Sequence, residues 1–270
     1  MCTMSVQPTL FLPHGGGPCF FMDWTWGPAD TWHPLAAFLQ NLPATLPESP
    51  KAILLVSGHW EETTFTVNTA ANPSLLFDYY GFPEHTYELE YPAPGHPALA
   101  QAVVEHISAA GLSVTTADDR GFDHGVFVPL KVAFPEANIP IVQLSLDRSL
   151  DPEIHLALGK ALAPLRKKGV LIVGSGMSWH NLRLYGRTET LLLSKSFDNW
   201  LTNAVEQPSA ESRNQLLTEW QTAPSARTAH PREEHLIPLM VAAGASGEDF
   251  GHRVFRDTPL DAVISAYRFG

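Results

Sequence analysis

The sequence predicts an α/β fold: a single domain with a central, mostly parallel or mixed sheet flanked by helices. Three short apolar runs, at residues 9–13, 53–58 and 170–176, are each followed within a few residues by a histidine. Leu- and Val-rich runs bounded by Gly or Pro are typical of buried parallel strands. Segments with helical spacing alternate with these runs. Because 270 residues, 44% of them hydrophobic, suffice for one large core, we expect one domain over residues 1–270.

The first half of the chain alternates predicted strands and helices with two aromatic loops. Leucines that share one face predict the first helix, and Pro43, Pro47 and Pro50 are expected to end it. Gly111 is expected to stop the second helix. In order, we expect a strand over 9–13, a helix over 34–42, strands over 52–58 and 63–68, a helix over 96–110 and a strand over 113–117.

The second half follows the same rules. Asp151 and Pro152 form a typical helix start, and Gly169 a typical stop. Pro238 is compatible with the first turn of a helix, where backbone N–H groups lack partners. In order, we expect a helix over 128–133, a strand over 139–145, a helix over 151–169, a strand from Val170, helices over 188–206 and 210–220, a loop over 221–230, a helix starting at Pro231 and a strand over 262–268.

The composition excludes several classes of partner. The formal net charge of −11 disfavours nucleic acids and anionic membranes, which require a basic surface. No run approaches 18 apolar residues, and residues 1–7 lack a signal-peptide pattern. We therefore expect a cytoplasmic protein whose partners are small molecules or proteins, a second copy of the chain included. Two cysteines, Cys2 and Cys19, exclude a disulfide framework, and Cys19 is more typical of a buried apolar position than of a nucleophile.

Histidines follow the three apolar runs, at His14, His59 and His180. The carboxyl ends of parallel strands meet at one edge of a sheet, where ligands collect. Neutral imidazole is a frequent ligand of Zn, Fe and Cu. A single histidine after a strand is usually an ordinary loop residue, but three of them beside glycines favour a transition-metal site at this edge.

Two further histidines enlarge the candidate set. His124 lies in a glycine-flanked turn, and His235 follows Glu233 and Glu234. Five histidines exceed the three ligands of a catalytic metal, so the surplus is expected to transfer protons or bind substrate. Adjacent helical residues point about 100° apart, so only one of Glu234 and His235 is expected to face the metal. We expect Asp123 to bond its own backbone.

The two loops at 15–34 and 75–95 are rich in Trp, Phe and Tyr. Aromatic loops beside a metal suit a flat apolar substrate. On this basis Trp24, Tyr80 and Phe82 are candidate substrate-binding residues. The same rings could instead pack in the core or between subunits.

Six motifs, in order, resemble those of the class III extradiol ring-cleavage dioxygenases. The resemblance spans residues 9 to 268 and is greatest to the DOPA 4,5-dioxygenase type, a group related to the catalytic subunit of protocatechuate 4,5-dioxygenase. The motifs are His14-Gly15-Gly16-Gly17-Pro18, Ser57-Gly58-His59-Trp60, Gly81-Phe82-Pro83 with Tyr91-Pro92-Ala93-Pro94-Gly95, Gly121-Phe122-Asp123-His124-Gly125, Ser175-Gly176 with His180-Asn181-Leu182, and Glu234-His235-Leu236 with Pro238-Leu239.

The resemblance implies a role for each histidine. His14, His59 and His235 would bind the metal, His180 would be the acid/base, and His124 would contact substrate or oxygen. It also implies Fe(II) as the active metal and a small aromatic diol and O₂ as substrates. Purified protein is expected to contain Zn(II), which binds nitrogen ligands more tightly. Two departures from the family pattern, at Gly58 and at residues 16–19, leave the substrate open.

Two alternatives remain at this point. A zinc hydrolase would use the same three histidines to lower the pKa of bound water to about 7. No carboxylate general base stands in a recognised position for it. A non-enzymatic, Memo-like metal-binding interaction protein of the same superfamily would keep the fold and the histidines. The presence of both His124 and His180 favours retained chemistry.

Overall fold

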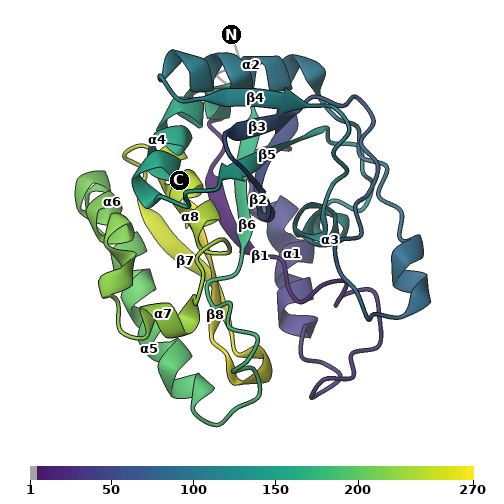
Figure 1. Cartoon of the computed structure of the whole chain (residues 1–270), viewed down its shortest axis with the longest axis vertical. Helices are drawn as coiled ribbons and strands as arrows, with labels where there is room; N and C mark the ends of the chain where they lie inside the picture. Colours follow the sequence, from purple (N-terminus) through teal and green to yellow (C-terminus); the bar gives the residue numbers. More distant parts are fainter. Residues whose placement is uncertain (1–4) are drawn as a thin grey trace.

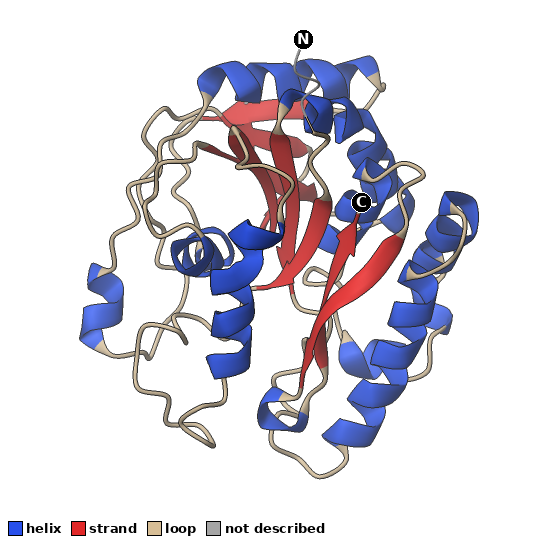
Figure 2. Cartoon of the chain, turned by 180° about the vertical axis from the view of Figure 1, so that it is seen from behind, coloured by secondary structure: helices blue, strands red, loops and turns tan. Residues whose placement is uncertain are grey.

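An eight-stranded sheet forms the centre of the computed structural model, which describes residues 5–270 (Figures 1 and 2). Its strand order is β4-β3-β5-β2-β6-β1-β8-β7. The strands are β1 (Thr9–Pro13), β2 (Ala52–Glu62), β3 (Phe65–Asn68), β4 (Val114–Ala117), β5 (Ile141–Asp147), β6 (Val170–Gly176), β7 (Gly251–Asp257) and β8 (Ile264–Phe269).

The four central strands, β5, β2, β6 and β1, are parallel. β3 is antiparallel to β5, and β8 and β7 extend the other edge in antiparallel pairing. Every residue of β1 and β6 is buried, as expected for strands that are covered on both faces. The predicted fold class, an α/β fold with a mixed sheet flanked by helices, is confirmed.

Helices cover both faces of the sheet (Figures 1 and 2). Successive side chains of β6 point to opposite faces. The Cα of Gly174 is packed against Pro238 in α8, whereas the hydroxyl of Ser175 contacts Gly125 in α3, so α8 and α3 lie on opposite faces. The helices are α1 (His33–Thr45), α2 (Pro97–Ala109), α3 (His124–Ala133), α4 (Pro152–Leu162), α5 (Thr190–Val205), α6 (Ala210–Thr218), α7 (Ala226–Ala229) and α8 (Ile237–Ala245).

Several predicted boundaries are wrong. Pro43 lies inside α1 and does not end it. α3 begins at His124, four residues before its predicted start, because its first turn has a Gly and little helical periodicity. The predicted loop over 221–230 contains the short helix α7. β7 was not predicted, and its alternation is interrupted by a register shift between Arg253 and Phe255.

The last helix starts later than predicted. The segment from Pro231 to Leu236 forms bends and turns, and α8 begins at Ile237 with Pro238 in its first turn. His235 therefore lies in the turn before the helix. Cys19 is buried and free, whereas Cys2 lies outside the described residues. Between residues 5 and 270, no helix is long and apolar enough to cross a membrane.

Candidate metal and proton-transfer site

Three of the predicted histidines bring their Nε2 atoms together. The Nε2 atom of His59 lies 3.1 Å from that of His14 and 3.2 Å from that of His235. His14 directly follows β1, His59 lies on β2, and His235 lies in the turn before α8. The side chains of His14 and His235 are almost fully buried. The structure thus places these three candidate ligands in one group.

The backbone brings His59 and His235 together by two local features. Between Val56 and Glu61, β2 advances five residues while β5 advances two, so β2 bulges where it bears His59. Gly58 faces the turn that bears His235: a Cβ there would lie 3.0 Å from the carbonyl oxygen of Glu234. A glycine at this position permits the close approach of the two segments.

The hydrogen-bond partners of these rings set the orientation of each Nε2 atom. His235 Nδ1 lies 2.9 Å from Glu234 Oε1, and His59 Nδ1 lies 3.5 Å from Asp78 Oδ2. A carboxylate oxygen only accepts, so His235 Nδ1 bears the hydrogen and His235 Nε2 keeps a lone pair, and the longer charge contact of His59 with Asp78 favours the same tautomer. His14 Nδ1 lies 3.2 Å from Ser175 Oγ, whose own hydrogen is donated to the carbonyl of Gly125. His14 therefore has the same tautomer.

This donor set fits a transition-metal ion. Three Nε2 lone pairs face one another without a hydrogen between them, an arrangement that a cation stabilises. Two nitrogen ligands at about 2.05 Å from one ion, at a tetrahedral angle, are about 3.3 Å apart. The separations of 3.1 and 3.2 Å agree with this value. Burial, followed by repulsion from neighbouring imidazoles, lowers the pKa of His14 and His235 well below the usual value, which keeps them in the neutral, ligating form.

The two remaining histidines lie beside the group of three. The His124 ring centroid is 3.9 Å from that of His59, and its Nδ1 donates to Asp78 Oδ1 at 2.8 Å. His180 stacks on His235 at 3.5 Å, and its Nδ1 lies 3.3 Å from Glu234 Oε1. Both rings are thus close enough to the ligand group to contact a molecule bound there.

Two carboxylates, Asp78 and Glu234, supply negative charge to the site. Burial by itself raises the pKa of Asp78, but the bonds and charge of His124 and His59 together outweigh it, and the pKa falls to about 2. Burial also opposes ionisation of Glu234, yet its bond from His180 and the charge of Arg232 leave its pKa below the usual value. Both groups are therefore ionised at neutral pH.

Glu234 and His235 divide their roles as expected for adjacent residues. His235 turns its Nε2 atom to the other ligands, and Glu234 accepts from the opposite side of the same ring. The expectation for Asp123 is wrong. Its side chain is fully buried and accepts from Ser57 on β2, Gln143 on β5 and Arg120, so it joins the elements beneath the site.

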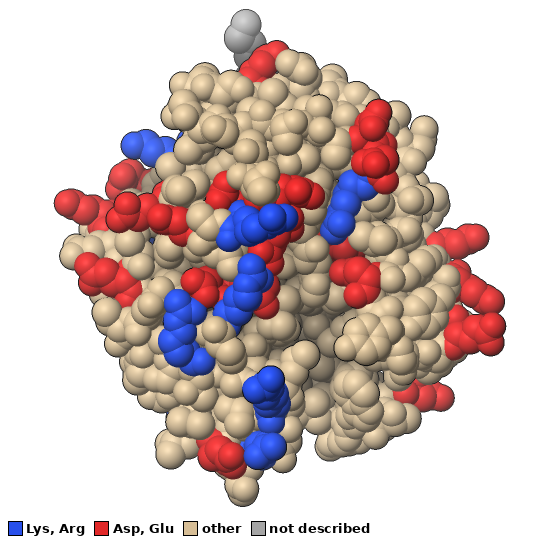
Figure 3. Space-filling model, in the orientation of Figure 1, with Lys and Arg blue, Asp and Glu red and all other residues tan. Residues whose placement is uncertain are grey.

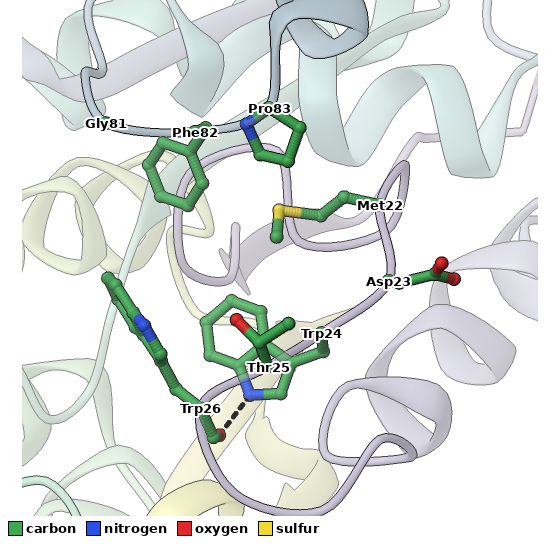
Figure 4. A pocket seen from close by; sticks show the side chains of 8 residues that line it. All are labelled: Met22, Asp23, Trp24, Thr25, Trp26, Gly81, Phe82 and Pro83. Carbon is green, nitrogen blue, oxygen red and sulfur yellow. Dashed lines mark hydrogen bonds between the residues drawn. The ribbon is translucent and has the colours of Figure 1, made fainter.

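The aromatic loop after His14 contributes both to the core and to a cavity. Trp24 is buried and packs edge-on against Trp32, whereas Trp26 is 62% exposed and its ring lies 6.1 Å from Phe82. Figure 4 shows the rings of Trp24, Trp26 and Phe82 around a cavity, with Met22 on one side. The volume of this cavity is about 360 Å³. The cavity is lined by Met22, Asp23, Trp24, Thr25, Trp26, Gly81, Phe82 and Pro83.

Tyr80 lies away from this cavity lining and is 90% exposed. Its neighbour Tyr79 is the buried residue of the pair, with its ring 5.8 Å from His124 and 5.4 Å from Phe82. Tyr79 is therefore the tyrosine that packs against a candidate site histidine, and the substrate-binding role of Tyr80 stays a prediction. The sequence did not distinguish two adjacent tyrosines in a segment without regular structure.

A second cavity, of about 450 Å³, opens beside His180 and Glu234. Arg183 and Arg232 line it, together with Leu182 and Asn181. Lys and Arg side chains, interspersed with Asp and Glu, follow the middle of the face shown in Figure 3. The protein thus has a basic cavity next to His180, lined by two arginines and one glutamate, despite its acidic overall charge.

The sequence did not single out Asp78, Ser175 or Arg120. Asp78 lies in the loop over 75–95, which is docked on the segment before α3 by the bond from Leu76 N–H to the carbonyl of Phe122. Only this docking brings its carboxylate to His124. Ser175 appeared in a motif, but its bond to His14 depends on the pairing of β6 with β1.

Comparisons with known proteins show similarity over almost the whole chain. Residues 8–269 match the family described as the catalytic LigB subunit of aromatic ring-opening dioxygenase. The chain is 38% identical to a 4,5-DOPA dioxygenase extradiol of Beta vulgaris (98% of this chain, 97% of the relative) and 37% identical to the dioxygenase tasH of Hapsidospora irregularis (99% and 86%).

A crystal structure of an uncharacterized Escherichia coli K12 protein superposes with a TM-score of 0.75 at 30% identity, covering 98% of this chain and all of that one. The identification of the chain as an enzyme of the extradiol dioxygenase group is confirmed by the family match and by the curated relatives. The chain belongs to the LigB family of aromatic ring-opening dioxygenases.

Proposed function

We propose that this protein is a non-haem, metal-dependent extradiol dioxygenase that opens the ring of a catechol-type substrate with O₂. The proposal covers residues 1–270 as one catalytic domain. The observation that supports it best is the convergence of the Nε2 atoms of His14, His59 and His235, with His124 and His180 beside them. The substrate is a DOPA-like or other small substituted catechol, in line with the name of the Beta vulgaris relative.

His14, His59 and His235 would hold the metal through Nε2. Ferrous iron bound there would leave coordination positions open and supply the redox chemistry that couples a catechol to O₂. Zn(II) would occupy the same nitrogen ligands in protein purified under air.

His180 is the proposed acid/base. Its Nδ1 lies 3.3 Å from the Glu234 carboxylate, which favours a hydrogen on Nδ1 and leaves the Nε2 lone pair to take a proton from a catechol hydroxyl and later return it. His124, fixed in the same way by Asp78, is placed to orient the substrate and to stabilise negative charge on oxygen. The buried ring of Tyr79 lies 5.8 Å from that of His124 and offers an apolar wall beside it.

The overall reaction balances without a further reductant. The C–C bond next to the diol breaks, and each of its two carbons gains one oxygen atom from O₂. A muconic semialdehyde-type product results, whose extended conjugation gives it a yellow colour.

The two cavities suit different parts of the substrate. Trp24, Trp26 and Phe82 offer flat apolar surfaces, and Arg183 and Arg232 offer positive charge beside His180. We infer that a carboxylate on the catechol's side chain is directed to the basic cavity. Small catechols with an anionic side chain are therefore the proposed substrate class.

The test is reconstitution. Metal-free protein is loaded with Fe(II) under anaerobic conditions, mixed with a panel of catechols, and then exposed to O₂ while the visible spectrum is recorded. A yellow product that requires Fe(II), O₂ and the three ligand histidines supports the proposal. Fully iron-loaded protein that leaves every catechol of the panel unchanged contradicts it.

Neither Asp78 nor Glu234 favours the zinc-hydrolase alternative. A general base for hydrolysis needs a carboxylate free to accept a proton from water. Both carboxylates already accept hydrogen bonds from histidine rings.

A further inference from the structure

Asp78 contacts two histidines that have different proposed roles. Its Oδ1 accepts from Nδ1 of His124 at 2.8 Å and from the His124 backbone N–H at 2.9 Å. Its Oδ2 lies 3.5 Å from Nδ1 of His59. The two rings are themselves neighbours, with centroids 3.9 Å apart. One carboxylate thus serves a proposed metal ligand and the non-ligand ring beside it.

Glu234 repeats this arrangement on the other side of the ligand group. Its Oε1 lies 2.9 Å from Nδ1 of His235 and 3.3 Å from Nδ1 of His180. These rings stack at 3.5 Å with an interplanar angle of 16°. Again one carboxylate serves a proposed metal ligand and the proposed proton-transfer ring beside it.

The chemistry of a carboxylate determines the tautomer of the two rings that donate to it, His124 and His235. It favours the same tautomer at His59 and His180, whose Nδ1 atoms lie 3.5 and 3.3 Å from the carboxylates. An ionised carboxylate has no hydrogen to donate, so each Nδ1 that faces it bears a hydrogen. In a neutral imidazole the other nitrogen, Nε2, then has the lone pair. The same oxygen atoms therefore direct a ligand lone pair to the metal and a base lone pair to the substrate.

We propose that Asp78 and Glu234 are positioning residues, each of which fixes one metal-ligand imidazole and one substrate-facing imidazole in the Nδ1–H tautomer. Metal binding and proton transfer then depend on shared carboxylates. The assignment of roles to the rings rests on the proposed function, whereas the tautomers follow from the contacts alone.

His14 provides the contrast within the same site. Its Nδ1 contacts the neutral hydroxyl of Ser175, and this hydroxyl contacts no second histidine in residues 5–270. Ser175→Ala would therefore release one ligand without releasing a proton-transfer ring. It is the natural comparison for changes at the two carboxylates.

Each carboxylate also has a polar partner other than the two imidazole rings. Glu234 Oε2 lies 3.4 Å from Arg232 Nη1, and Arg232 forms a two-pronged ion pair with Glu61 on β2. Asp78 is held by the backbone N–H of His124 at the start of α3. Each carboxylate therefore has a third partner that limits its movement when the metal is absent.

The first test reads tautomers in the metal-free protein by ¹⁵N NMR of histidine side chains near pH 8, above the usual imidazole pKa of about 6.5. In the wild type, His59, His124, His180 and His235 are expected as Nδ1–H tautomers. Any of the four found as Nε2–H overturns the assignment for its carboxylate. This measurement needs no variant and no enzymatic activity.

The second test changes each carboxylate to its amide. An amide both donates and accepts, so Glu234→Gln should give mixed tautomers at His180 and His235 only. Asp78→Asn should do so at His59 and His124 only. Glu233→Gln, whose carboxylate pairs with Arg227, and Asp119→Asn, at an exposed position, are the matched controls. Unchanged tautomers in both carboxylate variants, or the same change in the controls, would refute the proposal.

The third test asks whether metal binding and proton transfer both depend on the same carboxylates. Each amide variant should weaken Fe(II) binding about 10- to 100-fold, measured by chelator competition. After saturation with Fe(II), kcat should remain reduced in both amide variants, whereas the exposed control Asp119→Asn should keep the wild-type kcat. Full recovery in the amide variants would show that the carboxylates serve the metal alone.

A double-mutant comparison tests whether each carboxylate acts through its own substrate-facing histidine, Glu234 through His180 and Asp78 through His124. The loss of kcat in Glu234→Gln should not add to that of His180→Ala but should add to that of His124→Ala. Additivity in both combinations overturns the proposed sharing by Glu234. If no catechol is cleaved but the tautomers respond as expected, the proposed function fails and the positioning assignment stands.

Discussion

His180→Ala should separate metal binding from catalysis. His180 lies 3.3 Å from Glu234 and stacks on His235, and it is not one of the three rings whose Nε2 atoms converge. The bond between His235 Nδ1 and Glu234 at 2.9 Å remains in the variant. We therefore expect Fe(II) affinity to change less than about tenfold, which is below the 10- to 100-fold cost that is usual when a direct hydrogen-bond partner of a metal ligand is lost.

Activity should fall much further. Loss of a positioned general acid/base costs about 10²–10⁴-fold in rate, which corresponds to roughly 2.7–5.5 kcal/mol in activation free energy. His235→Ala, in contrast, should lose both metal and activity. The assay combines elemental analysis of each variant with the initial rate of ring opening after Fe(II) loading. An empty site in His180→Ala together with a full site in His235→Ala would refute the assignment and exchange the two roles.

Four further outcomes are expected. Protein purified under air should contain Zn(II) and gain activity only after exchange for Fe(II), as elemental analysis and rate measurements would show. Arg183→Ala should raise KM several-fold for catechols with an anionic side chain and leave KM for neutral catechols unchanged. Catechol binding should quench tryptophan fluorescence less in Trp26→Phe than in the wild type, and equal quenching would place the wall elsewhere. Burial, foremost among the causes, lowers the pKa of His230 to about 3. Below about pH 6.5 the unfolded chain therefore binds a proton that the folded chain does not, so the free energy of unfolding should fall on acidification. In denaturant titrations of metal-free protein, the dependence of this free energy on pH should be weaker by about 1.4 kcal/mol per pH unit in His230→Gln than in the wild type.

The central strands were predictable because they are buried on both faces. The apolar runs at β1, β2, β5 and β6 have the composition of such strands, and all four form in parallel. β7 was missed because it pairs only at the sheet edge, is half-buried and contains Arg253 and Arg256. Its position depends on pairing with β8, which no local pattern reveals.

The candidate ligands were predictable in kind, but their partners were not. Parallel pairing of β1, β6 and β2 brought His14, directly after β1, and His59, at the bulge of β2, to one edge of the sheet. The positions of Asp78 and Ser175 depend instead on contacts between segments far apart in the sequence, 46 residues for Asp78 and His124 and 161 for Ser175 and His14. Those contacts exist only once the loop over 75–95 and the sheet have formed.

The most direct test of the proposed function uses ¹⁸O₂. Fe(II)-loaded wild-type protein is mixed with a catechol that bears an anionic side chain, and the product is analysed by mass spectrometry before its aldehyde exchanges oxygen with water. The proposed reaction predicts a ring-opened product that contains both atoms of ¹⁸O₂. A ring-opened product that contains no ¹⁸O, or an unchanged catechol at full iron occupancy, would contradict it.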